Sequence, residues 1–259
     1  MSFKDKNGVD SSQGMLDVST GEHCPVCGEE LFVRCVWGGL KIPLPCSCKK
    51  EKFAEEKREK EEREKFQKEY MIKELYKNSG MPPKELKETF ENFTPRPGTE
   101  NALKAAKRFA AKAPKVSKGI LFMGTCGSGK THLAAAIGKE VMNKGYSVKF
   151  ITASDFYKNI RATFSENSIT EKDVIAPLIK CRLLIVDEIG ATAPTAFSKS
   201  EFHSLIDMRL RYERPTILTT NLTTEELSQA FDSRTVDRFS EGFVNVIITA
   251  DSYRRKGAG

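Results

Sequence analysis

The stretch GTCGSGKT, from Gly124 to Thr131, restricts the possible folds of this chain more than any other feature. It fits the pattern G-x-x-x-x-G-K-[ST], follows the apolar segment GILFM and opens the helical segment THLAAAIG. Glycines in such a loop let backbone N–H groups surround phosphate oxygens, and the helix N-terminus adds partial positive charge. A glycine-rich turn that matches by chance is the alternative, but the strand–loop–helix context disfavours it. The sequence therefore predicts a nucleotide site, with ATP as the expected cofactor.

The end of this loop carries the side chains with specific roles. Lys130 is expected to neutralise the β- and γ-phosphates, and the Thr131 hydroxyl is expected to ligate Mg²⁺. The residues expected to contact the nucleotide are Gly124, Thr125, Cys126, Gly127, Ser128, Gly129, Lys130, Thr131 and His132.

A second motif, LLIVDEIG, places Asp187 and Glu188 after a run of four apolar residues. Asp187 is expected to hold Mg²⁺ through its water shell, and Glu188 to polarise the attacking water as general base. The alternative is that the two acids merely cap the next element. An adjacent glutamate beside a phosphate loop favours hydrolysis over nucleotide binding alone.

A polar residue, Asn221, ends the strand-like segment ILTT. The carboxyl ends of neighbouring parallel strands face the same crevice. The Asn221 amide could therefore hydrogen-bond the γ-phosphate or the lytic water. Capping of the following segment, LTTEEL, is an equally good interpretation.

Residues 80–259 alternate between apolar strand-like segments and helical segments. The strands are apolar without alternation, as expected where helices cover both faces of a parallel sheet. This predicts an α/β ATPase domain. The expected strands are 119–123, 147–152, 181–189, 215–220 and 243–249, and the expected helices are 100–113, 131–145, 154–164, 170–180 and 199–213.

Three regions are predicted ahead of this domain. Residues 1–20 are polar and expected to be disordered, residues 21–48 form a cysteine-rich module, and residues 49–79 form a charged linker helix. The helix contains i,i+4 pairs such as Glu59 with Arg63. Nine basic and eight acidic side chains alternate between Lys49 and Tyr70, which favours a solvated spacer over a nucleic-acid arm.

Five of the seven cysteines lie between Cys24 and Cys48. A C-x₂-C pair and a C-x-C pair are separated by 18 residues that contain an expected hairpin turn at Gly38-Gly39. The spacing predicts a zinc-ribbon-like site that holds together a module too small for a core of its own. The expected Zn²⁺ ligands are Cys24, Cys27, Cys46 and Cys48, although His23 or Cys35 could replace one, and unrelated buried thiols remain the alternative. Trp37 is expected to pack on this module or to contact a partner, and Cys126 and Cys181 to be packing residues.

The net charge of +7 is unevenly distributed. Residues 1–80 carry 15 basic and 15 acidic side chains, and residues 81–259 carry 27 and 20. The excess points to a polyanionic partner of the second part. A basic stretch there could follow a DNA backbone or be a solvated helix face; it consists of Lys104, Lys107, Arg108, Lys112, Lys115 and Lys118. No apolar run approaches the roughly 18 residues of a membrane helix, and no secretory signal is recognisable. A cytoplasmic protein without membrane contact is expected.

The order of six short motifs resembles a known family. The chain resembles the DnaC/DnaI-type replicative helicase loaders in the motifs that it carries and in their order: TFENF, the phosphate loop, VDEIG, LTTN, RTVDRF and DSYRRK. These are AAA+ ATPases of the ASCE type, and IstB-type transposition helpers are near relatives. The resemblance covers roughly residues 80–256 and implies a parallel sheet without a C-terminal lid.

The resemblance also implies site residues and partners. Asn221 resembles the sensor 1 residue, Arg238 the arginine finger with Arg234 as its substitute, and Arg254 the sensor 2 arginine. The implied partners are a hexameric DnaB-type helicase gripped by the zinc module, single-stranded DNA, and further copies of the chain joined through their ATP sites. Lys158 and Arg161 lie where family members hold single-stranded DNA.

Several alternatives remain open from the residues alone. Arg234 and Arg238 could be a basic pair on a solvated helix, bonded to Asp237 or Glu241. The whole chain could be an IstB-like ATPase that acts on duplex DNA. It could also be an adaptor that uses ATP binding only as a switch.

Overall fold

The computed structural model describes residues 15–36, 39–113, 115–163, 170–191 and 195–253. The expectations for Trp37, Gly38 and Arg254 lie outside these residues. The chain divides into two units, Met1–Lys68 and Glu69–Gly259. Among the described residues, no helix combines the length and the apolar character that crossing a bilayer demands.

The first unit contains a three-stranded antiparallel sheet. Its strands are β1 (Met15–His23), β2 (Glu30–Val36) and β3 (Lys41–Pro43), in the order β1-β2-β3. Cys35 lies opposite Lys41, so the predicted hairpin between the two apolar runs is confirmed.

The prediction of disorder through residue 20 is wrong for residues 15–20, which belong to β1. Val18 lies opposite Val33 in β2, and the Asp17 carboxylate accepts a hydrogen bond from Arg34 Nε at 2.7 Å. Apolar and polar residues alternate in LDVS, which is a strand pattern that the polar composition of the segment obscured.

A single helix, α1 (Ser47–Lys77), contains the charged stretch, and none of its residues is buried. The predicted pair between Glu59 and Arg63 is present at 3.4 Å, and Lys57 pairs with Glu61 at 3.8 Å. The helix ends just before Gly80, whose backbone is left-handed (φ 71°).

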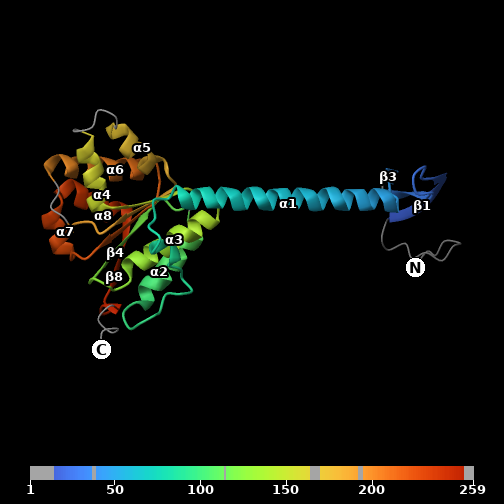
Figure 1. The fold of residues 1–259 in the computed structure, drawn as a ribbon. Helices are drawn as coiled ribbons and strands as arrows, with labels where there is room; N and C mark the ends of the chain where they lie inside the picture. Colours follow the sequence, from blue (N-terminus) through green and yellow to red (C-terminus); the bar gives the residue numbers. More distant parts are fainter. Residues whose placement is uncertain (1–14, 37–38, 114, 164–169, 192–194, 254–259) are drawn as a thin grey trace. The chain divides into compact units, whose positions relative to one another are not determined.

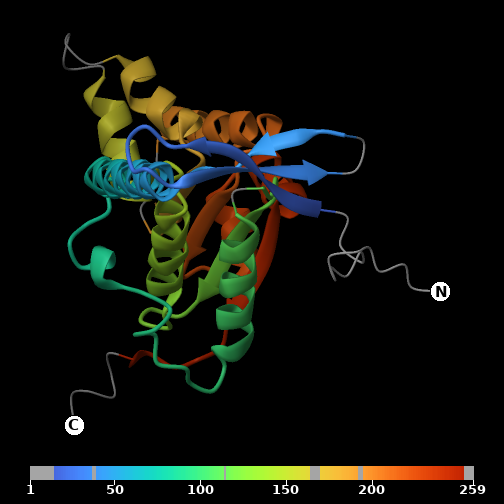
Figure 2. The same cartoon turned by 90° about the vertical axis from the view of Figure 1, so that its right-hand side faces the viewer.

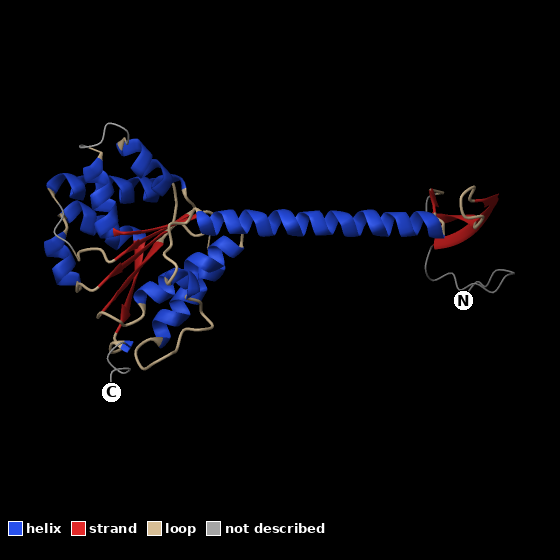
Figure 3. Ribbon diagram, in the orientation of Figure 1, coloured by secondary structure: helices blue, strands red, loops and turns tan. Residues whose placement is uncertain are grey.

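The second unit is built on the predicted parallel sheet, which is confirmed (Figure 3). All neighbouring strands pair parallel, in the order β5-β6-β7-β4-β8. The strands are β4 (Gly119–Gly124), β5 (Val148–Thr152), β6 (Leu183–Asp187), β7 (Thr216–Thr220) and β8 (Phe243–Ile248). Met123 lies opposite Thr220, and Val186 opposite Leu218. The carboxyl ends of β4, β6 and β7 therefore meet at one edge.

Helices cover both faces of this sheet (Figure 1). On one face lie α2 (Glu100–Lys112) and α3 (Lys130–Asn143), which are side by side in Figure 1 and in the turned view of Figure 2. The other helices are α4 (Ala153–Ala162), α5 (Glu171–Lys180), α6 (Ala196–Arg211), α7 (Thr224–Ala230) and α8 (Ser233–Gly242), and a short 3-10 helix, η2, spans Glu85–Lys87.

The apolar strands supply a core on each side of the sheet. Ile120 and Phe122 of β4 pack in the cluster of α2 and α3, whereas Leu121 and Met123 pack in the cluster of α4 to α8. This two-sided burial is the reason why the strands carry no polar alternation.

Candidate functional site

The phosphate loop joins β4 to α3, as its sequence predicts. Gly129 immediately precedes α3 and has a left-handed backbone (φ 108°). A Cβ atom at Gly129 would lie 2.9 Å from Cε2 of Phe93, so the loop also passes too close to that ring for a side chain. Both constraints require glycine at this position.

Lys130 lies inside the loop and contacts the end of β7. Its side chain is buried, and Nζ donates hydrogen bonds to the carbonyls of Gly124 and Thr125, each at 2.8 Å, and to Asn221 Oδ1 at 2.6 Å. The capping interpretation of Asn221 is wrong, because Thr223 caps α7 through a capping box with Glu226. The structure therefore brings Asn221 to the phosphate loop.

Thr131 and Asp187 lie together at the start of α3 and the end of β6. The Thr131 hydroxyl donates to the two carboxylate oxygens of Asp187 at 2.9 and 3.1 Å. Burial raises the pKa of Asp187, while hydrogen bonds from Thr219 and Thr131 oppose that rise. A hydroxyl and a carboxylate are the hard oxygen ligands that Mg²⁺ prefers, and a divalent cation there would favour the ionised carboxylate. These residues fit a Mg²⁺ site.

Glu188 follows Asp187 in an uncommon conformation. Its backbone is left-handed (φ 58°), and its exposed side chain lines the pocket described below. The alternative that these acids cap the next element is wrong, because α6 is capped by Thr195. The Glu188 carboxylate is thus available to solvent beside the phosphate loop.

A pocket of about 440 Å³ opens at this edge of the sheet. Of the predicted residues, it is lined by Cys126, Gly127, Gly129, Lys130, Thr131, His132, Asp187, Glu188 and Asn221. Ser128 is fully buried, and Gly124 and Thr125 contribute the carbonyls that Lys130 binds. Cys126 is exposed, so its assignment as a packing residue is wrong: its position in the loop turns it outward. Cys181 is buried, as predicted.

One side of this pocket was not predicted from the sequence. The additional lining residues are Lys84, Glu85, Glu88, Asn92, Phe93, Thr94, Arg96 and Tyr253. Most come from the segment around TFENF, ahead of the ATPase core. The available signal was the resemblance of TFENF to the family's entry segment, because α2 and β4 separate this motif from the phosphate loop in the sequence. Residues 84–96 are called the entry segment below.

Polar contacts fix this entry segment to the loop. His132 Nδ1 lies 2.6 Å from Glu88 Oε2, and His132 Nε2 lies 2.7 Å from the Thr89 carbonyl. The Arg96 guanidinium donates to the carbonyls of Gly127 and Ser128, each at 3.3 Å. It also lies over the Tyr253 ring, 5.3 Å from its centre.

The predicted arginine finger lies away from the pocket. Arg238 is on α8, and its Nε and Nη1 contact Asp207 Oδ1 at 3.0 Å and Glu241 Oε2 at 2.8 Å. Arg234 is exposed on the same helix. Neither arginine lines the pocket of its own chain.

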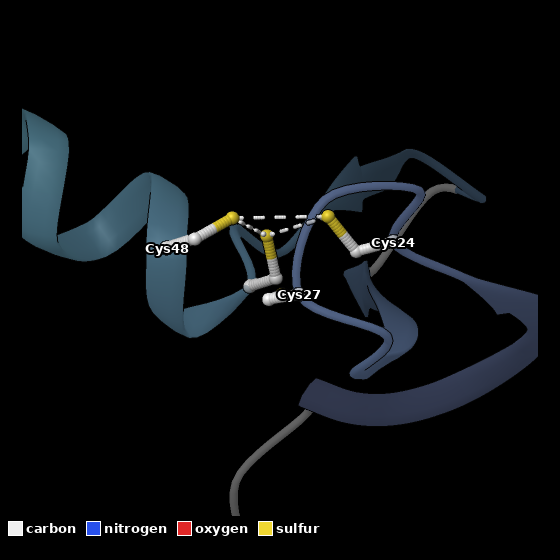
Figure 4. Close-up of side chains that lie close together, drawn as sticks. Cys24, Cys27 and Cys48 are labelled. Carbon is white, nitrogen blue, oxygen red and sulfur yellow. Dashed lines mark hydrogen bonds between the residues drawn. The ribbon is translucent and has the colours of Figure 1, made fainter.

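The four predicted zinc ligands form one cluster in the first unit. The sulfur atoms of Cys24, Cys27, Cys46 and Cys48 all lie within 4.8 Å of one another. Figure 4 shows the side chains of Cys24 and Cys48 facing each other, with Cys27 beside them. Among the described residues, neither His23 nor Cys35 joins this cluster. Cys35 lies on β2 opposite Lys41.

The geometry of the cluster suits a tetrahedral Zn²⁺ ion. A Zn–S bond of about 2.3 Å places tetrahedral sulfurs ~3.8 Å apart. The measured separations are 3.8 Å for Cys24 and Cys48, 3.4 Å for Cys46 and Cys24, and 3.3 Å for Cys46 and Cys48. Hydrogen bonds from the backbone N–H groups of Cys27 and Val26 lower the pKa of Cys24 to about 6, whereas the neighbouring Cys46 and Cys27 thiols raise the pKa of Cys48 to about 12. The cluster is thus compatible with a zinc module.

Comparisons with known proteins agree with the nucleotide-site geometry of the second unit. A family model described as IstB-like ATP binding protein matches residues 57–258. The replicative helicase loader DnaC of Escherichia coli K12 is 32% identical over 186 residues, which cover 71% of this chain and 76% of that protein.

Solved structures show the same fold. A crystal structure of the DnaC helicase loader has a TM-score of 0.59 and 21% identity, covering 65% of this chain and 100% of that one. A crystal structure of DnaI also has a TM-score of 0.59, with 23% identity, covering 65% of this chain and 95% of that one. The chain therefore belongs to the IstB-like ATP-binding family, and within it to the AAA+ ATPases of the DnaC type, the replicative helicase loaders.

Proposed function

We propose that this protein hydrolyses ATP to load a hexameric DnaB-type replicative helicase onto single-stranded DNA. One observation carries this proposal: Lys130, Thr131, Asp187, Glu188 and Asn221 gather around one pocket, in a chain of the DnaC family. The seven free cysteines suit the reducing cytoplasm, where replication proteins act.

The residues of the pocket suit in-line attack of water on the γ-phosphate. Lys130 and the loop N–H groups would hold the phosphates, and Thr131 and Asp187 would hold Mg²⁺, which supplies charge neutralisation of the phosphate oxygens. Glu188 would polarise the attacking water, and Asn221 would orient it. Arg254 would be the sensor 2 arginine by its resemblance to the family.

Arg238 is assigned to the nucleotide of a neighbouring copy. Support comes from its position outside its own pocket and from the resemblance of RTVDRF to the family motif. Within its own chain Arg238 contacts Asp207 and Glu241, and the Glu241 contact is the one that the solvated-helix alternative predicts. An arginine supplied in trans stabilises charge that develops on the transferred phosphoryl group.

Arg238→Ala should lower turnover by about three orders of magnitude, as measured by phosphate release. Mixing Arg238→Ala with Lys130→Ala chains should restore turnover. The Lys130→Ala chain lacks a working pocket but supplies its Arg238 to the intact pocket of the Arg238→Ala chain. Arg211→Ala, which also loses a contact to Asp207, is the control. A mixture that stays inactive would exclude the assignment in trans.

The cysteine cluster is assigned to structural zinc. A four-cysteine site holds about one Zn²⁺ per chain. Cys46→Ser should lose most of this zinc, as measured by elemental mass spectrometry. Cys35→Ser is the matched control, because Cys35 is in the same sheet but outside the cluster. Equal zinc content in the two variants would contradict the assignment.

The zinc module is assigned to helicase docking. Its sheet exposes apolar side chains on both faces: Leu16 and Val18 are 54% and 47% exposed on one face, and Ile42 is 44% exposed on the other. Clustered exposed apolar residues often mark protein interfaces.

Single-stranded DNA is assigned to the basic side chains of the second unit. The cations of α2 and the segment after it are all exposed; they are Lys104, Lys107, Arg108, Lys112, Lys115 and Lys118. Lys158 and Arg161, on α4, are exposed as well. Such side chains suit phosphate contacts without sequence preference.

A second candidate, remodelling of duplex DNA for a transposase, is favoured by the family model, whose description is IstB-like. The deciding experiment follows helicase transfer onto circular single-stranded DNA, with duplex DNA as competitor. We expect ATP-dependent transfer and preference for the single strand. Duplex preference without transfer would support the second candidate.

A further inference from the structure

A buried hydroxyl in the middle of the sheet contacts both acids of the pocket. Thr219 is on β7 and is 0% exposed. A hydroxyl buried in a strand is unfavourable unless it is hydrogen-bonded. The hydrogen-bond partners of the Thr219 hydroxyl therefore indicate its role.

The Thr219 hydroxyl is used as a donor and as an acceptor. Oγ1 donates to Asp187 Oδ1 at 2.5 Å and accepts from the backbone N–H of Glu188 at 2.9 Å. The Thr219 carbonyl accepts from the Ile189 N–H, also at 2.9 Å. One residue of β7 thus holds three consecutive residues at the end of β6.

These contacts fix features on which the chemistry depends. The hydroxyl bond to Asp187 orients the carboxylate that Thr131 also contacts. The bond to the Glu188 N–H holds a backbone with φ 58°, a conformation that a residue with a side chain keeps only when its surroundings enforce it. The direction of the Glu188 side chain follows from that backbone.

We propose that Thr219 is a positioning residue for both acids. It aligns the Asp187 carboxylate with Thr131 for Mg²⁺ and aims the Glu188 carboxylate into the pocket. Thr219 does not line the pocket itself, so it acts only through its neighbours. The inference rests on the proposed ATP hydrolysis at this pocket.

Thr219→Val keeps the shape of the side chain and removes both hydroxyl bonds. It should lower kcat by at least about tenfold. Tight binding of a non-hydrolysable ATP analogue should also require an Mg²⁺ concentration that is higher by a similar factor. The affinity for that analogue without Mg²⁺ should stay within about twofold, because Lys130 and the loop are unchanged. Thr219→Ser should recover both losses, since serine keeps the hydroxyl.

Thr216→Val is the matched control, because Thr216 is a buried threonine at the other end of β7 whose hydroxyl accepts from Arg209 Nε. It should lower the melting temperature without changing the Mg²⁺ dependence. The inference would be overturned if Thr219→Val had the same kcat and the same Mg²⁺ dependence as the wild type. It would also be overturned if Thr219→Ser were impaired to the same extent as Thr219→Val.

The two proposals fail in different ways. A wild type that binds the analogue with Mg²⁺ but hydrolyses no ATP would overturn the proposed hydrolysis, and the Mg²⁺ dependence of Thr219→Val would still decide the role of Thr219. A wild type without any response to Mg²⁺ would overturn both proposals together.

Discussion

Glu188→Gln should bind ATP as tightly as the wild type and hydrolyse it about two to four orders of magnitude more slowly. Glutamine keeps the shape of the side chain, and the backbone N–H of residue 188 still donates to the Thr219 hydroxyl. The neutral amide, however, cannot accept a proton from water. Filter binding of labelled ATP and single-turnover phosphate release would separate the two effects.

Glu213→Gln is a matched control, because Glu213 is the other described non-glycine residue with a left-handed backbone, at φ 50°, and it does not line the pocket. It should hydrolyse ATP at the wild-type rate. Unchanged turnover in Glu188→Gln would remove Glu188 as the general base. If Glu188→Gln hydrolysed ATP slowly but still loaded the helicase over many cycles as the wild type does, the result would support the use of ATP binding as a switch.

Arg209→Met should destabilise the second unit by about 3–5 kcal/mol, because several buried acceptors would lose their donor at about 1–3 kcal/mol each. Arg209 is 0% exposed, and its guanidinium donates to acceptors from two segments, residues 178–182 and 215–216. The acceptors are the carbonyls of Leu178, Ile179, Cys181, Arg182 and Pro215, and the Thr216 hydroxyl. Methionine would leave these groups buried without a donor. Urea denaturation would measure the change in the free energy of unfolding.

Burial also lowers the pKa of Arg209 to about 10, which still leaves it charged at neutral pH. Arg211→Met is the control on the same helix, because the Arg211 side chain is 74% exposed and only pairs with Asp207. Its loss should cost about 0–1 kcal/mol. Similar midpoints for the two variants would show that the buried network does not stabilise the fold.

Local pattern was sufficient to predict the central part of the site. The phosphate loop and the end of β6 are adjacent because parallel strands end at one edge, so Lys130 and Asp187 could be placed together from sequence order. For Asn221 the sequence left capping as an equally good interpretation, and the structure decided between the two. The same holds for the cysteine cluster, whose spacing was informative because zinc ligation demands it.

Tertiary contacts between distant segments were not predictable in this way. Phe93 packs on Gly129, and Arg96 binds the loop carbonyls, but no local pattern in TFENF or PRPG specifies those partners. Arg209 continues the i, i+3, i+4, i+7 spacing of the buried residues Phe202, Leu205 and Ile206. An arginine is seldom fully buried, so this position is explained only by the acceptors that α5 and β7 bring to it. Thr219 was hidden for a related reason, since threonine is common in strands whether or not its hydroxyl has a role.

The most direct test of the loader assignment is size-exclusion chromatography with light scattering. The protein would be mixed with the replicative helicase of its host, with and without ATP and Mg²⁺. We predict a stable complex that co-elutes with the wild type and is lost with Cys46→Ser but kept with Cys35→Ser. Absence of a complex in every nucleotide state would contradict the assignment of this chain as a helicase loader.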